Sequence, residues 1–88
     1  MSTPPGPRRA RIRAKLEAGE LPRDLPFAAG FGRMLGIRYG ISEGTVCSGC
    51  DEPIKAGERM VDYTYSSGRT TAFHEECGRV WEEERHRQ

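Results

Sequence analysis

Three cysteines and one histidine are the residues of this 88-residue chain whose types and spacing could do chemistry. Two residues separate Cys47 from Cys50, and two residues separate His74 from Cys77, so the pattern is C-x2-C-x23-H-x2-C. A Cys-x2-Cys pair alone is compatible with a redox dithiol, with part of a disulfide framework or with half of a metal site. The other residues of the chain must decide among these three kinds of chemistry.

A metal site is the interpretation that accounts for all four residues. The chain has three cysteines, and an odd number cannot pair completely into disulfides within one chain. A thioredoxin-type dithiol lies at a helix start in a βαβ unit, whereas here an acidic and proline-containing stretch follows at 51–53. Thiolate sulfur and imidazole nitrogen are ligands that suit tetrahedral Zn²⁺. We therefore predict one Zn²⁺ per chain, with four ligands: Cys47, Cys50, His74 and Cys77.

The predicted zinc site is structural rather than catalytic. A catalytic zinc typically has three protein ligands and keeps one position for water, whereas four good ligands close the site. His74 lies in no HExxH-type motif, and no Ser/His/Asp set is apparent. We expect no enzymatic activity, and we expect metal binding to supply much of the folding free energy. A redox-responsive zinc switch is a further hypothesis, which predicts rapid release of zinc under mild peroxide.

A hairpin and a helix must position these ligands. Residues 58–66 alternate apolar and polar side chains like a half-buried strand, and residues 69–73 return after a Ser67-Gly68 turn. Residues 74–87 then predict a helix whose first turn places His74 and Cys77 on one face. Ser48 and Gly49 are small enough for a tight turn between the first two thiolates. The expected core, rather than a contact surface, comprises Val61, Tyr63, Phe73, Val80 and Trp81.

The order of the elements resembles a known class of zinc finger. Residues 47–81 resemble single PARP-type zinc fingers and the first finger of LIM domains. The resemblance lies in the stretches CSGCDEPIKAGE and FHEEC and in Trp81. The same residues are also similar to small bacterial proteins of unknown function that share a CxxC…HxxC…W pattern. The resemblance implies a treble-clef fold, with a zinc knuckle, a β-hairpin and a C-terminal helix. The resemblance covers about half of the chain. The only functional residues that it assigns to this chain are the four zinc ligands.

The remaining part of the chain is expected to be less regular. Residues 1–7 predict a disordered lead-in, and residues 8–19 predict a short basic helix ended by Gly19. Residues 20–44 predict a Pro- and Gly-rich connector that is a loop, partly packed through its apolar side chains. Residues 45–88 are the predicted zinc-binding module. The whole chain is thus expected to be a small α+β domain stabilised by zinc.

Charge and composition bear on the partners. Residues 1–46 hold eight Lys or Arg and four Asp or Glu, a net +4, whereas residues 47–88 hold six and nine, a net −3. The acidic module and the apolar connector favour a protein partner. The alternative is an accessory nucleic-acid binder whose affinity falls with salt. Its candidate contact residues are Arg8, Arg9, Arg11, Arg13 and Lys15.

Other partner classes are not expected. A GxxxG membrane face is interrupted by Arg33 and Arg38, and no segment approaches 18 apolar residues. A dinucleotide motif of the GxGxxG type does not fit the glycines at 30–36, so no small-molecule substrate is predicted. The sequence begins without an apolar run of signal-peptide length, and its cysteines and histidine are used for metal. We therefore expect a cytoplasmic protein.

Overall fold

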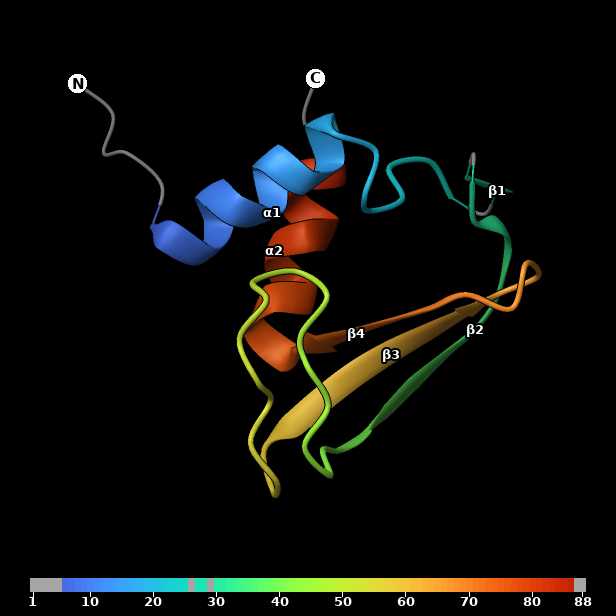
Figure 1. Ribbon diagram of the computed structural model, residues 1–88. Coiled ribbons are helices and arrows are strands. Elements are labelled where there is room, and N and C mark those ends of the chain that lie inside the picture. Colours follow the sequence, from blue (N-terminus) through green and yellow to red (C-terminus); the bar gives the residue numbers. More distant parts are fainter. Residues whose placement is uncertain (1–5, 26, 29, 87–88) are drawn as a thin grey trace.

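The computed structural model describes residues 6–25, 27–28 and 30–86. Their secondary structure consists of two helices, α1 (Pro7–Glu17) and α2 (Glu75–Arg85), and four strands, β1 (Phe27–Ala28), β2 (Gly32–Ile41), β3 (Arg59–Tyr65) and β4 (Thr70–His74). The strands form one antiparallel sheet in the order β1-β2-β3-β4. Figure 1 shows α1 crossing α2, with the sheet beneath them. The expected small α+β architecture is therefore present.

β3 and β4 form the predicted hairpin. Its turn runs through Ser67 and Gly68, and Gly68 has a φ of 89°, which glycine adopts without strain. The predicted alternation in β3 is confirmed, because Val61, Tyr63 and Tyr65 are buried while their neighbours are more exposed. The hairpin thus presents one apolar face, and α2 covers it.

The core lies between this hairpin and α2. The ring of Trp81 stacks on Phe73, with centroids 5.0 Å apart. Tyr63 meets both rings edge-on, at centroid distances of 5.9 Å to Phe73 and 4.8 Å to Trp81. All three aromatic side chains are buried. The prediction that they form core is therefore confirmed.

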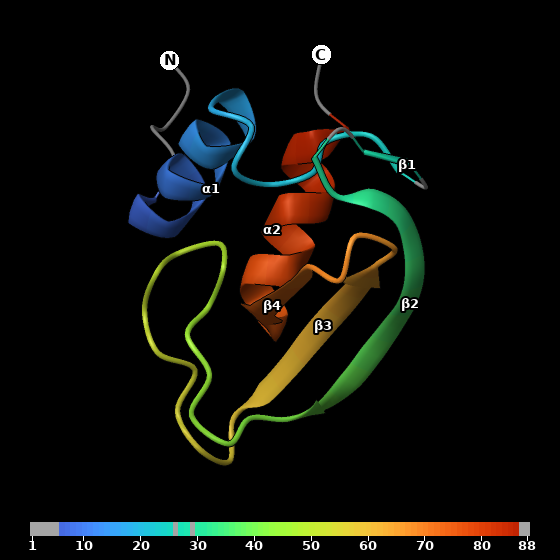
Figure 2. The same cartoon turned by 45° about the vertical axis from the view of Figure 1, so that its right-hand side comes forward.

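Helix α1 is docked rather than free. Ile12 and Leu16, which form its narrow apolar stripe, are both buried. After the helix the chain passes across α2 (Figure 2), and the indole N–H of Trp81 donates to the carbonyl of Pro22 at 2.9 Å. Pro7 begins the helix, where its missing N–H is no loss. The lead-in expected at 1–7 is thus wrong for Pro7, and residues 1–5 lie outside the described residues.

The prediction of a loop over 20–44 is wrong for residues 27–28 and 32–41, which form β1 and β2. The glycines suggested a loop, but Ile37, Tyr39 and Ile41 alternate with Arg38 and glycines, with the period of a strand. Pairing with β3 along almost all of β2 outweighs the weak strand preference of glycine. At position 32 glycine is favoured by its φ of 86°, and a Cβ there would also lie 2.3 Å from the Ser66 hydroxyl oxygen.

Neither helix of the described chain has the length and apolar character needed to cross a bilayer.

Candidate metal centre

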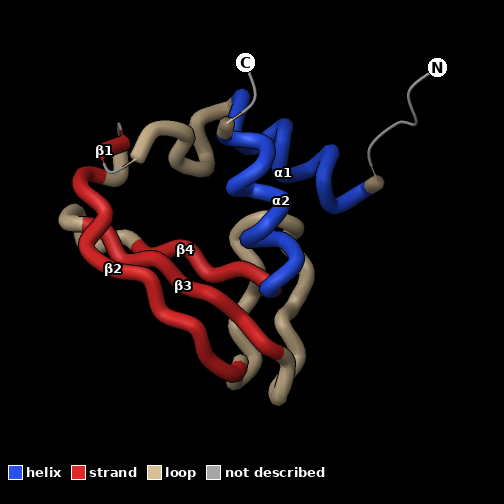
Figure 3. Tube along the Cα trace, turned by 180° about the vertical axis from the view of Figure 1, so that it is seen from behind, coloured by secondary structure: helices blue, strands red, loops and turns tan. Residues whose placement is uncertain are grey.

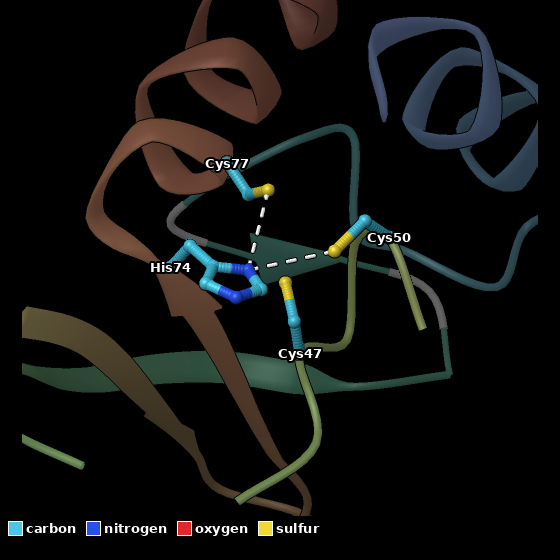
Figure 4. Close-up of side chains that lie close together, drawn as sticks. All are labelled: Cys47, Cys50, His74 and Cys77. Atoms are coloured by element: carbon cyan, nitrogen blue, oxygen red, sulfur yellow. Dashed lines mark hydrogen bonds between the residues drawn. The ribbon is translucent and has the colours of Figure 1, made fainter. Parts of the chain in front are cut away.

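The four predicted ligands come together in one buried cluster. Cys47 and Cys50 lie on the turn that precedes β3, His74 ends β4, and Cys77 lies in the first turn of α2. All four are buried, and their sulfur and nitrogen ligand atoms lie within 4.8 Å of one another. Figure 4 shows the three sulfur atoms gathered around the Nδ1 edge of the imidazole. The spacing in sequence thus corresponds to one site in space.

The distances fit one metal ion. Nδ1 of His74 lies 3.4 Å from Sγ of Cys50 and 3.6 Å from Sγ of Cys77. A tetrahedral ion with sulfur bonds of about 2.3 Å and nitrogen bonds of about 2.0 Å places sulfur and nitrogen roughly 3.5 Å apart. The three cysteines are not joined by disulfides. The cluster can therefore hold a metal ion with little movement of these ligand atoms.

A backbone carbonyl on the side of the imidazole away from the cysteines fixes the orientation of the His74 ring. Its other nitrogen, Nε2, lies 3.2 Å from the carbonyl oxygen of Pro53. A carbonyl only accepts hydrogen bonds, so Nε2 must carry the proton and Nδ1 is left with its lone pair toward the sulfurs. Such a partner behind a ligating histidine fixes both the tautomer and the ring orientation. Pro53 was not recognised as part of the site, because a backbone carbonyl leaves no signature in a sequence.

Backbone hydrogen bonds shape the knuckle that carries Cys47 and Cys50. Cys47 N–H donates to the carbonyl of Glu52 at 2.9 Å, and Asp51 N–H donates to the carbonyl of Cys47 at 3.0 Å. The residue of the knuckle with a left-handed conformation is Asp51, at φ 65°, and not Gly49. Gly49 is needed for space instead. A Cβ there would lie 3.0 Å from the Ile12 side chain.

Ser48 attaches the knuckle to the hairpin. Its backbone N–H donates to the carbonyl of Ala72 at 2.6 Å, and its hydroxyl oxygen accepts from Ala72 N–H at 3.0 Å. Ala72 lies two residues before His74 on the outer edge of β4. This exchange holds the two ligand pairs in register. In the sequence, only the small size of Ser48 was considered. The structure shows that its hydroxyl group also accepts a hydrogen bond from Ala72.

The first turn of α2 lies close to β3. A Cβ on Gly78, the residue after Cys77, would lie 2.7 Å from a methyl group of Val61. The glycine that weakens this helix locally therefore allows the helix to approach the sheet. The approach places Cys77 one helical turn after His74, facing the knuckle.

The three thiol groups differ in pKa. A hydrogen bond from the Cys77 thiol lowers the pKa of Cys47 to about 4, and backbone N–H groups of Cys50, His74 and Gly49 support the same thiolate. Burial raises the pKa of Cys50. The hydrogen bond to the Cys47 thiolate, followed by burial, raises the pKa of Cys77. Near neutral pH the cluster therefore prefers one thiolate and two thiols, and a metal ion must displace the two remaining thiol protons.

Two cations of α1 bind the knuckle directly. The Arg11 guanidinium donates to the carbonyl of Cys50. The Lys15 ammonium donates to the carbonyl of Ser48 at 2.8 Å and also forms an ion pair with Asp51. These contacts place two positive charges against the turn that carries Cys47 and Cys50. Two of the five residues predicted to contact nucleic acid thus bind the turn that carries Cys47 and Cys50.

The other three basic residues of α1 also bind the C-terminal half. Arg8 forms an ion pair with Glu52 at 3.1 Å. Arg9 and Arg13 both bind the buried carboxylate of Glu84 in α2, at 2.6 and 2.7 Å. The structure therefore engages every one of the five candidate side chains in an intramolecular contact.

No family model, curated protein or solved structure matches this chain. The fold and the site alone define its class: a small α+β domain with a buried cluster of three cysteines and one histidine that could bind a metal ion.

Proposed function

We propose that this protein is a zinc-stabilised, non-enzymatic interaction module. The observation that carries the proposal is the buried cluster of Cys47, Cys50, His74 and Cys77, whose ligand atoms all lie within 4.8 Å of one another, with sulfur–nitrogen separations of 3.4 and 3.6 Å. Three sulfur ligands and one imidazole form a donor set that selects Zn²⁺ over the harder Mg²⁺ and Ca²⁺, which prefer oxygen.

A structural role for the metal is supported by the closure of the site. All four ligand residues are buried, and a catalytic zinc needs one position open to water and substrate. The order of knuckle, β3–β4 hairpin and α2, with two candidate ligands from the knuckle and two from the helix start, supports the proposal of a treble-clef fold. In this proposal the ion fastens the knuckle to the helix, and the fold then presents a surface to a partner.

A protein is the partner that the surface favours. The exposed large apolar side chains gather on or near β2, with exposed fractions from 47% to 72%: Phe27, Leu35, Ile37, Tyr39, Ile41 and Val46. Exposed apolar residues that cluster in this way mark interaction surfaces. The basic residues of α1, by contrast, are engaged with acidic groups and carbonyls, which weakens the case for a nucleic-acid partner.

Native mass spectrometry with and without a chelator tests the proposal. We expect one Zn²⁺ per chain, lost on replacing Cys77→Ser together with the near-ultraviolet signal of the buried Trp81. The exposed Thr64→Ala variant is the matched control and should keep both. A metal-free wild-type chain with a native fold would contradict the proposal.

A further inference from the structure

Helix α1 lies across the boundary between the two halves of the metal cluster. One half is the Cys47–Cys50 knuckle, and the other is the start of α2 with Cys77. Arg8 bridges the two halves, because its guanidinium pairs with Glu52 beside the knuckle at 3.1 Å and with Glu76 of α2 at 3.8 Å. Figure 3 shows the loop that carries the knuckle (tan) directly beneath the two helices. One side chain of α1 thus holds both sides of this boundary.

The surface of the protein is hollowed next to the cluster. A hollow of about 280 Å³ reaches the candidate ligand His74, and Arg8 forms part of its wall together with Glu75, Glu76 and Arg79. Arg8 therefore lies where solvent comes close to the cluster.

The middle of α1 covers the knuckle. Ile12 is fully buried, and its side chain lies so close to Gly49 that a Cβ there would be only 3.0 Å away. Arg11 holds the same turn through the carbonyl of Cys50. All three cysteines of the cluster are 0% exposed. Because Gly49 lies between two of them, α1 is part of the cover that keeps solvent from the sulfur atoms.

This cover is fastened mainly by charged groups. The buried residues of α1 are Ile12 and Leu16, and a helix of eleven residues is marginally stable by itself in water. The arginines that attach it to the C-terminal half, Arg8, Arg9 and Arg13, keep 32% to 42% of their side chains exposed. Ion pairs at such positions contribute little stability and weaken with salt. Since α2 carries the aromatic core, α1 is the part of the cover that opens at the lowest cost.

We propose that α1 is a strap over the metal cluster, and that its opening, rather than unfolding of the whole domain, sets the rate at which a bound ion leaves. The inference rests on the metal binding proposed above and adds a route by which the ion reaches an acceptor. Opening of the strap breaks the ion pairs of Arg8, Arg9 and Arg13 and leaves the core between α2 and the β3–β4 hairpin closed. Release should therefore respond to salt.

Transfer of Zn²⁺ from the loaded full-length protein to a chromogenic chelator, followed by stopped flow, measures the release. We expect its rate constant to rise about three- to tenfold from about 50 mM to about 500 mM NaCl, because salt screens the ion pairs that hold α1. A rate constant that does not change over this range would overturn the inference.

Hydrogen exchange of the loaded protein, read by mass spectrometry, separates opening of the strap from global unfolding. Amides of α1 should exchange faster than those of α2 and of the hairpin, and salt should accelerate α1 by the same factor as zinc release. Equal acceleration of α1, α2 and the hairpin would show that release follows global unfolding, and would overturn the strap.

Two variants test the contacts that hold the strap. Glu84→Gln removes the carboxylate that binds Arg9 and Arg13, and it should accelerate zinc release about three- to tenfold and reduce its dependence on salt. Arg8→Gln, at a partly exposed position that should tolerate the change, should accelerate release about two- to fivefold. The matched control is Asp62→Asn, which removes the carboxylate paired with Arg38 on the sheet and should leave release unchanged.

Zinc content, measured on every protein used, distinguishes the two proposals. A wild type that binds no zinc would overturn the metal site and the strap together. A wild type that binds one zinc, and whose release is as slow in Arg8→Gln and Glu84→Gln as in Asp62→Asn, would overturn the strap alone.

Discussion

Ser48 and Ala72 exchange two hydrogen bonds, through the Ser48 N–H at 2.6 Å and the Ser48 hydroxyl oxygen at 3.0 Å. One residue lies between Cys47 and Cys50, and the other lies two residues before His74. The exchange therefore sets the distance between the two halves of the cluster before any metal binds. A metal site whose halves are already in register loses less conformational entropy when the ion arrives.

Replacement of Ser48→Ala should loosen the site. The change leaves Ala72 N–H without its acceptor, which costs about 1–2 kcal/mol of unfolding free energy, and displaced supports of this kind weaken metal affinity about tenfold or more. Competition with a chromogenic chelator measures the affinity, and urea unfolding measures the stability. Ser67→Ala, in the exposed hairpin turn, is the control. Equal chelator resistance of the two variants would show that Ser48 does not position the site.

Replacement of Gly78→Ala should destabilise the protein, although the same change usually stabilises a helix by about 1 kcal/mol. The new Cβ would lie 2.7 Å from a Val61 methyl group, so the helix or the strand must shift, at a cost of about 1–3 kcal/mol. A double-mutant cycle with Val61→Ala isolates this clash, because removal of that methyl group makes room for the Cβ. The two changes should be less harmful together than the sum of the single effects, and additive effects would contradict the close approach.

Metal affinity should rise steeply with pH. The pKa of Cys47 is lowered to about 4, so it is already a thiolate at neutral pH, whereas the pKa values of Cys50 and Cys77 are raised. Binding of the metal must then release the two thiol protons of Cys50 and Cys77, so acid opposes binding. At pH values above the pKa of Cys47 and below those of Cys50 and Cys77, the affinity for the metal should rise about a hundredfold per pH unit. Calorimetry in buffers of different ionisation enthalpy counts the protons. Release of three would show that Cys47 is protonated in the metal-free protein.

The basic residues of α1 should not bind nucleic acid appreciably. Arg9 and Arg13 are held by Glu84, and Arg8 by Glu52, so a phosphate would have to displace these partners. In an electrophoretic shift titration at low salt, we expect no retarded band for duplex or single-stranded DNA or RNA at about 10 µM protein. A shift that disappears in Arg9→Ala but persists in Arg23→Ala, an exposed site outside α1, would restore the nucleic-acid hypothesis.

The elements next to the ligands were predictable because their signals are local. The alternation around Tyr63 and the turn at Ser67 and Gly68 reside in a few consecutive residues, and both agree with the structure. His74 and Cys77 share a helix face by their spacing alone. β2 was missed because its glycines and its alternation give opposite signals. The partner strand that decided between them begins 18 residues after β2 ends.

The role of α1 could not be predicted, for a different reason. Its basic residues are compatible with a solvent-exposed helix face and with a segment that binds nucleic acid. The sequence alone does not indicate which acidic groups lie near them in the fold. Glu84, the carboxylate that holds Arg9 and Arg13, is more than 70 residues away, at separations of 75 and 71. Burial of Ile12 over Gly49 brings the two helices together and thereby makes these ion pairs.

By itself, the sequence determined which three cysteines and one histidine form the cluster, the β3–β4 hairpin and the helix that follows it. These depend on residue type and short-range spacing, which any conformation of the chain retains. Only the tertiary structure decided that a glycine-rich segment becomes β2 and that α1 braces the knuckle through Arg11 and Lys15. Each of these depends on hydrogen bonds, ion pairs or packing between segments distant in the chain, and such contacts exist only once the chain has folded.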